Sequence, residues 1–258
     1  MAKKKPLILV SNDDGIESEG IKALMNEMRK IGEVIVVAPN SQQSAVGHAV
    51  TVANPIRVYK NLLDKDFYGY AVDGTPADSV KLAVRTLLKG RKIDLLVSGI
   101  NHGSNTAINI IYSGTVSAAT EGTILGIPSI AFSLTSYTSN DFGPSANFAG
   151  KLAKIILKKG LPKGTLLNVN VPALPASKIK GAIVTKQGKS FWDDRYEKRF
   201  DPNKREYYWL TGKMAKLDKT KEFDQKAIDS GYISVTPIQY DLTDYGMYEE
   251  MQDWGIEY

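Results

Sequence analysis

The sequence predicts an α/β fold in which a mostly parallel sheet is flanked by helices and followed by a smaller, β-rich C-terminal extension. In the first two-thirds of the 258 residues, short apolar runs alternate with segments of helical spacing. Strands separated by helices indicate βαβ units, whose strands run parallel. The apolar runs are nearly uninterrupted, as expected where both faces of a sheet are covered. After residue 188 the chain becomes polar, charged and aromatic, so we expect a core over 1–188 and an extension over 189–258.

The predicted elements follow one another in a regular order. Uninterrupted apolar runs indicate strands, and apolar residues that recur every three or four positions indicate helices. Thr75 and Pro76 mark one helix start, because Thr caps helices and Pro is favoured in the first turn. We expect strands at 6–10, 33–38, 94–98, 127–132, 165–171, 206–211 and 230–236, and helices at 20–31, 75–88, 113–125, 146–158 and 246–254.

Composition restricts the class of protein. The chain has no cysteine, which excludes disulfides and thiolate metal sites and fits a reducing compartment. The basic start at 1–6 is followed by an apolar run too short for a signal peptide, and no stretch reaches membrane-spanning length. We therefore expect a cytoplasmic protein without a targeting segment or a membrane partner. The net charge of +5 is scattered along the chain, so no specific nucleic-acid partner is indicated.

Polar loops at 11–15, 39–44 and 98–103 follow three of the predicted strands. Ligands of open α/β sheets bind at the carboxyl ends of the strands, so we expect these loops to converge. Asp13 and Asp14 repel each other unless a cation lies between them, and Gly15 permits the turn that both require. With neutral oxygens from Ser44 and Asn101, they would form a site suited to Mg²⁺, Mn²⁺ or Ca²⁺.

Each of these features also has a purely structural explanation. Paired acids before a glycine are common in turns and at helix starts. Ser44 could bond to nearby backbone, and Asn101 could belong to a turn. The two histidines, His48 and His102, both lie in polar loops, where they would act as general acids or simply make local hydrogen bonds. The convergence of several polar strand ends is what favours a metal site.

A fourth polar segment, at 111–115, precedes a helix made of small residues. Hydroxyl groups and free N–H groups at a helix start bind anions, but they also serve as ordinary caps. We expect phosphate to bind there because the preceding strand carries Asn101.

These segments together resemble the SurE family, the survival-protein 5'/3'-nucleotidases. The matching stretches are ILVSNDDGIESEGIKAL, VVAPNSQQSAVGHAVT, DGTPADSVKLA, LLVSGINHGSN and YSGTVSAATEGTILGIPSIAFS, with REYYWLTG and GYISVTPIQYDLT farther on. They cover nearly the whole chain in the family's order. Shortly after the position of Asn105, many relatives have a glycine followed by an acidic residue, as in NLGDD. This chain has Thr106 to Asn109 there, so an acidic residue near the site is missing.

The resemblance implies a Rossmann-like core and an extension that mediates dimer or tetramer contacts. It implies a 5'-nucleotidase, a phosphoric monoester hydrolase that converts nucleoside monophosphates to nucleoside and phosphate, with 3'-nucleotides and short polyphosphate as further substrates. One divalent cation per subunit, Mg²⁺ or Mn²⁺, is the implied cofactor. Asp13 and Asp14 would be catalytic and would bind the metal together with Ser44 and Asn101. We expect phosphate or substrate to be bound by Asn12, Ser44, Asn101, Asn105, Ser113, Gly114 and Thr115.

Other classes of protein fit the sequence less well. A Mg²⁺-binding phospho-receiver domain without hydrolase activity also has paired acids after its first strand, but it needs an acceptor aspartate where this chain has Asn101. A dinucleotide-binding enzyme expects G-x-G-x-x-G after that strand. A haloacid-dehalogenase-type phosphatase needs Asp-x-Asp, which adjacent aspartates do not match. The aromatic residues near 192 and 207–209 could stack on a base, but we favour contact with a partner subunit.

Overall fold

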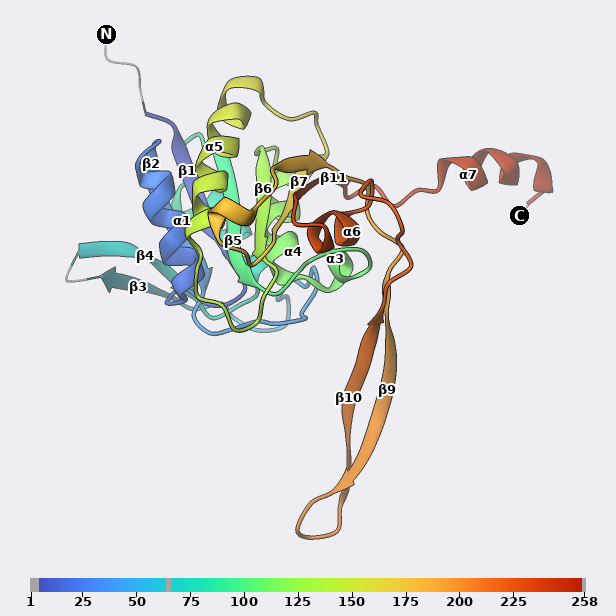
Figure 1. The fold of residues 1–258 in the computed structure, drawn as a ribbon. Helices are drawn as coiled ribbons and strands as arrows, with labels where there is room; N and C mark the ends of the chain where they lie inside the picture. Colours follow the sequence, from blue (N-terminus) through green and yellow to red (C-terminus); the bar gives the residue numbers. More distant parts are fainter. Residues whose placement is uncertain (1–4, 64–65, 257–258) are drawn as a thin grey trace.

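Figure 1 shows the computed structural model of the chain, which describes residues 5–63 and 66–256. Within these residues a nine-stranded sheet crosses the body, and helices cover both of its faces (Figure 1). A long hairpin and the C-terminal helix project away from the body (Figure 1). The expected α/β class, with a mostly parallel sheet and a further β element near the C-terminus, is therefore confirmed.

The sheet is parallel through its centre and antiparallel towards both edges. The strands from β4 to β7 run parallel, whereas β3 is antiparallel to β4 and β11 is antiparallel to β7. In spatial order the strands are β3 (Val58–Leu63), β4 (Asp66–Val72), β2 (Glu33–Pro39), β1 (Leu7–Ser11), β5 (Leu95–His102), β6 (Ser129–Leu134), β7 (Thr165–Val171), β11 (Ile233–Gln239) and β8 (Ala182–Val184).

The helices pack in pairs against the two faces of the sheet. One face carries α1 (Glu19–Arg29) and α5 (Gly143–Lys159), whose apolar residues join one buried cluster. The other face carries α2 (Pro76–Leu82) and α4 (Gly114–Ile124), which belong to a second cluster. Shorter elements connect these layers: η1 (Ala83–Leu87), α3 (Asn109–Tyr112), η2 (Ala176–Lys178) and α6 (Asp224–Asp229). The sheet therefore separates two apolar cores.

The antiparallel pair β3 and β4 was not expected from the sequence. Lys60 and Asn61 interrupt the first segment, and the second, DFYGYAV, is rich in tyrosine and broken by a glycine, so neither contains an uninterrupted aliphatic run. Their place in the sheet comes from the pairing of β4 with β2. At Gly69 the two strands approach so closely that a Cβ atom would lie 2.4 Å from the carbonyl oxygen of Val36. This close approach is a tertiary feature that local sequence pattern does not reveal.

The residues after 188 divide between the body and two projections. The expected strand at 230–236 corresponds to β11, which lies in the main sheet beside β7. In contrast, β9 (Phe191–Phe200) and β10 (Glu206–Ala215) form a separate two-stranded hairpin (Figure 1). The terminal α7 (Tyr245–Met251) and η3 (Gln252–Trp254) also project (Figure 1). In the described part of the chain, no helix has the length and apolarity needed to span a membrane.

Gly20 allows α1 to lie directly against β5, because a Cβ atom at this position would fall 2.0 Å from the carbonyl oxygen of Ile100. We expect Gly20→Ala to lower the free energy of unfolding by roughly 1–3 kcal/mol through overpacking. Gly246→Ala in the exposed α7 is the matched control, because the nearest atom to its added Cβ would be 3.5 Å away. Urea unfolding followed by circular dichroism measures both variants, and an unchanged midpoint for Gly20→Ala would contradict the close approach.

Candidate active site

The candidate site lies at the carboxyl ends of β1 and β5, at the centre of the sheet. The chain leaves β1 towards β2 on one side, whereas β5 and β6 extend the sheet on the other. Such a reversal of strand order creates a crevice in which α/β proteins bind ligands. A cavity of about 280 Å³ opens there. Of the residues predicted for the site, those that line this cavity are Asp13, Ser44, Asn101, His102, Asn105 and Ser113.

Asp13 and Asp14 give this site its negative charge; Asp13 lines the cavity, whereas Asp14, the next residue, is absent from the residues described as lining it. Asp13 is only 6% exposed, and burial raises the pKa of its carboxyl group to about 6, although a hydrogen bond from the Thr115 hydroxyl opposes the shift. Burial also raises the pKa of Asp14, which accepts a hydrogen bond from the backbone N–H of His102 at 3.3 Å. Among the described residues, no lysine or arginine lines the cavity. A bound cation would therefore relieve the cost of holding both carboxylates ionised.

The turn after β1 is held by Asn12, which is fully buried. Its side-chain amide donates to the carbonyl of Gly15 at 2.9 Å and to the hydroxyl of Ser18 at 2.8 Å. Gly15 adopts a φ of +96°, a conformation that side chains other than glycine rarely permit. Asn12 thus fixes the turn that presents the two acids, and it is absent from the residues described as lining the cavity.

Asn101 reaches the cavity because β5 is irregular near its end. The register with β6 shifts between Ser98 and Asn101. Within this bulge Gly99 has a φ of +129°, and a Cβ atom there would lie 2.4 Å from the carbonyl oxygen of Phe132. The Asn101 amide nitrogen donates to the carbonyl of Gly103 at 2.8 Å, so its Oδ1 atom is the one suited to bind a cation.

The loop that carries Ser44 is attached to the site by backbone hydrogen bonds. The backbone N–H of Gln43 donates to the carbonyl of Asp13 at 2.7 Å. That of Gly47 donates to the carbonyl of Tyr112 at 3.1 Å. Ser44 lies between these two attachments and accepts a hydrogen bond from Gln42 at 2.8 Å. Its hydroxyl therefore stands at the cavity in a loop held at both ends.

The start of α4 meets Asp13 directly. Ser113 caps the helix by accepting from the backbone N–H of Val116 at 3.1 Å, and it also lines the cavity. The Thr115 hydroxyl donates to Asp13 and is fully buried. A Cβ atom on Gly114 would lie 2.7 Å from that of Asp13. Thr115 and Gly114 therefore hold and accommodate the carboxylate, whereas Ser113 faces the cavity.

Asn105 belongs to a buried polar cluster that the sequence did not predict. Its backbone N–H donates to Asn170 at 2.8 Å, and its amide donates to Ser133 at 2.9 Å. Its carbonyl accepts from Asn168 at 2.7 Å and from Asn170 at 3.0 Å. The sequence does contain a signal for this cluster: Asn168 and Asn170 are polar residues at alternate positions of the otherwise apolar β7. This cluster fixes the backbone at the cavity wall.

The two histidines have different surroundings. His48 lies 3.0 Å from Glu121, which also pairs with Lys81 at 2.9 Å, and it is absent from the residues described as lining the cavity. His102 does line the cavity. Its Nε2 atom lies 3.1 Å from the carbonyl of Ser139, and its ring meets that of Phe142 edge-on at 4.8 Å. Of the two, only His102 is placed where it could meet a substrate.

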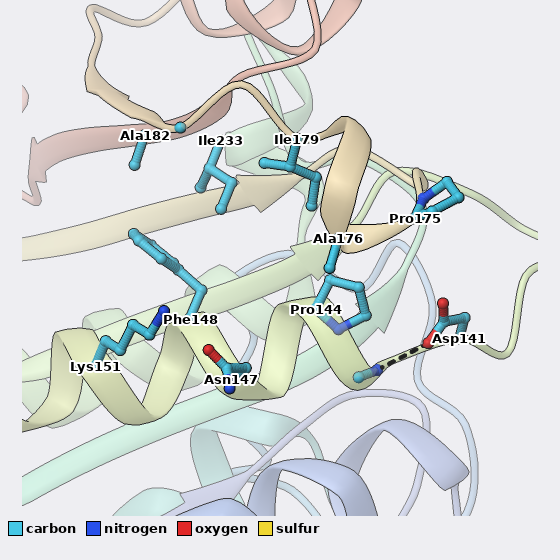
Figure 2. A pocket seen from close by; sticks show the side chains of 12 residues that line it. Asp141, Pro144, Asn147, Phe148, Lys151, Pro175, Ala176, Ile179, Ala182 and Ile233 are labelled. Carbon is cyan, nitrogen blue, oxygen red and sulfur yellow. Dashed lines mark hydrogen bonds between the residues drawn. The ribbon is translucent and has the colours of Figure 1, made fainter.

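A larger cavity of about 780 Å³ lies elsewhere, between α5 and the segment around η2, β8 and β11 (Figure 2). Phe148 and Ile233 face each other across it, and Ile179 lies beside Ile233 (Figure 2). Asp141 and Lys151 are its charged residues in the described chain. Asp141 is the one carboxylate among its described lining residues and has no acidic neighbour in the chain, whereas Asp13 of the smaller cavity is followed by Asp14, so the smaller cavity fits a metal-dependent reaction better.

Comparisons with known proteins agree with the resemblance seen in the sequence. The family model described as Survival protein SurE matches residues 8–194. A protein of Christiangramia forsetii named 5'-nucleotidase SurE is 49% identical over 259 residues, covering 99% of both chains. One of the same name from Chlorobium phaeobacteroides is 48% identical over 254 residues, covering 98% of both.

The similarity extends to three-dimensional structure. The crystal structure of the SurE protein from Aquifex aeolicus matches with a TM-score of 0.84 and 42% sequence identity, covering 96% of this chain and 98% of that one. The sequence motifs, the full-length relatives and the shared fold lead to one conclusion. This chain belongs to the SurE family.

Proposed function

We propose that this protein is a divalent-metal-dependent 5'-nucleotidase that hydrolyses nucleoside monophosphates to nucleoside and phosphate. The observation that carries the proposal is the pair of adjacent carboxylates in the turn after β1, of which Asp13 lines a cavity together with Ser44 and Asn101. The names of the full-length relatives support the same activity. We include 3'-nucleotides and short polyphosphate in the range of substrates to be tested. A cytoplasmic location, which the absence of cysteine supports, completes the proposal.

The donor groups fit a hard cation. Asp13, Asp14, Ser44 and Asn101 offer oxygen atoms alone, the ligand type that Mg²⁺ and Mn²⁺ accept. In the described chain no group of three or more His, Cys, Asp or Glu is positioned to hold a metal, so neutral oxygens must complete the set. One such cation per subunit would supply positive charge that neutralises the phosphate oxygens during the reaction.

The protein's own residues would position the reactants. Phosphoryl transfer depends mainly on alignment and charge neutralisation. Ser113 presents a hydroxyl group at the start of α4, where free N–H groups favour phosphate. Thr115 and Gly114 keep Asp13 in place, and Asn105 shapes the opposite wall.

The receiver-domain alternative is not favoured. Its acceptor aspartate is missing, because the polar end of β5 carries Asn101. The full-length relatives also carry the name of a hydrolase. Incubation with acetyl phosphate separates the two functions, since a receiver becomes stably labelled whereas the proposed hydrolase releases phosphate.

The projecting hairpin supports the further proposal that the protein forms a dimer or tetramer. All residues of β9 are exposed. The outer part of the hairpin, which both strands form, carries large apolar side chains. They include Phe200, Tyr207 and Trp209, which are 57%, 39% and 56% exposed. Large exposed apolar surfaces mark interaction sites. We assign the extension at 189–258 this role in assembly.

Asp13→Asn and Asp14→Asn should each reduce phosphate release from AMP by more than about a hundredfold, because each removes a charged ligand of the cation. The amide has the same size as the carboxylate, so the circular dichroism spectrum should not change. Asp141→Asn, in the cavity of Figure 2, is the matched control and should keep wild-type activity. Wild-type turnover by both site variants at saturating metal would defeat the ligand assignment.

Exhaustive chelation should abolish phosphate release, and added Mg²⁺ or Mn²⁺ should restore it, because no lysine or arginine among the described residues lines the cavity to replace the cation. A colorimetric phosphate assay over a panel of nucleoside monophosphates, with each metal and without metal, measures this dependence. Full activity in the chelated protein would show that the reaction needs no cation.

Replacing residues 197–209 with an Asn-Gly turn should shift the mass in solution towards the monomer, because it removes the exposed outer half of the hairpin. The replacement joins Tyr196 and Leu210, which are paired across the two strands. Light scattering of the wild type and the shortened protein at equal concentration provides the measurement. An unchanged mass would exclude the outer hairpin as the assembly surface.

A further inference from the structure

The candidate active site continues into a second cavity. This neighbouring cavity has a volume of about 820 Å³ and shares Ala45, Asn109, Tyr112 and Trp192 with the first. Small-molecule sites usually occupy about 300–1,000 Å³. The first cavity, at about 280 Å³, therefore has room for a cation and a phosphate group but little space for a nucleoside. The rest of a nucleotide must extend past the shared residues.

The second cavity is formed largely by the base of the hairpin, where it joins the body. We call this part, residues 191–194 and 210–212, the hairpin neck. Trp192 pairs with Met214, and Asp194 pairs with Gly212. Side chains alternate along a strand, so Trp192 and Asp194 point to the same side of the hairpin. Both line the second cavity, and Gly212 adds no side chain that would cover the tryptophan ring.

The chemistry of the second cavity favours a flat, uncharged ring. Trp192 and Tyr112 are 39% and 56% exposed and lie where the two cavities meet. Aromatic side chains bind nucleobases by stacking, whichever base is present. Asp194 is the charged residue there, and no lysine or arginine lines either cavity in the described chain. A polyphosphate chain would find no positive charge, whereas a base can donate N–H groups to Asp194.

We propose that the hairpin neck binds the nucleobase of the substrate, with Trp192 as the stacking surface. This inference rests on the proposed nucleotidase function and refines it. It divides the hairpin into a neck that serves the active site and an outer part left for assembly. It also makes a nucleotide a better substrate than a phosphate ester without a base.

The test compares AMP with ribose 5-phosphate, which keeps the sugar and the ester but lacks the base. In steady-state kinetics Trp192→Ala should raise the KM for AMP about tenfold and leave the KM for ribose 5-phosphate unchanged. Trp192→Phe, which keeps an aromatic ring, should recover most of the affinity for AMP. Tyr59→Ala is the control and should leave both KM values unchanged, because Tyr59 lies in the edge strand β3 and is absent from the residues described as lining either cavity.

The kinetic results separate a failure of the stacking role of Trp192 from a failure of the nucleotidase function. An equal rise in KM for both esters, or no change for either, would overturn the stacking role of Trp192 while leaving the nucleotidase intact. Tyr137 lines only the first of the two cavities, so a base-selective loss in Tyr137→Ala instead would place the base elsewhere and also overturn the proposal. Failure of the wild type to hydrolyse either ester in the presence of metal would refute the proposed function itself. Thermal unfolding of Trp192→Ala shows whether the neck still folds.

Discussion

The site depends on one electrostatic constraint, which is the burial of the Asp13 carboxylate beside that of Asp14. The protein holds these groups together at the end of a central strand, and no lysine or arginine within the described ranges lines the cavity that Asp13 lines. Burial disfavours ionisation of Asp13, as its raised pKa indicates. The surrounding groups add hydrogen bonds to the two carboxylates from the Thr115 hydroxyl and from the backbone of His102. An external cation is the simplest complement to this arrangement.

Much of the surrounding backbone is arranged to satisfy that constraint. Gly15 permits the turn, Gly99 permits the bulge that delivers Asn101, and Gly114 leaves space beside Asp13. Each glycine meets a different local requirement of the backbone, yet all three lie around the same site. The parallel strands supply a rigid edge, and the irregular ends of β1 and β5 supply the chemistry. Regular and irregular backbone thus have separate roles here.

The sequence predicted the parts of the fold that depend on local pattern. The apolar runs of β1, β2, β5, β6 and β7 identified the centre of the sheet, and the polar loops after them identified the acids and Asn101. The pair β3 and β4 was not predicted because Lys60 and Asn61 interrupt β3, Gly69 interrupts β4, and the pairing of β4 with β2 fixes their place in the sheet. For the aromatic residues near Trp192 the sequence offered base stacking only as the less favoured alternative, and it could not connect Thr115 with Asp13, since those contacts join residues distant along the chain.

The loop that bears Ser44 is held by main-chain atoms at Gln43 and Gly47. Hydrogen bonds of this kind do not depend on which side chain a residue carries. Mutations can therefore accumulate at exposed positions of the loop during evolution without displacing the serine hydroxyl. The path of the backbone thus preserves the position of the serine hydroxyl, while the exposed side chains around it can differ between relatives.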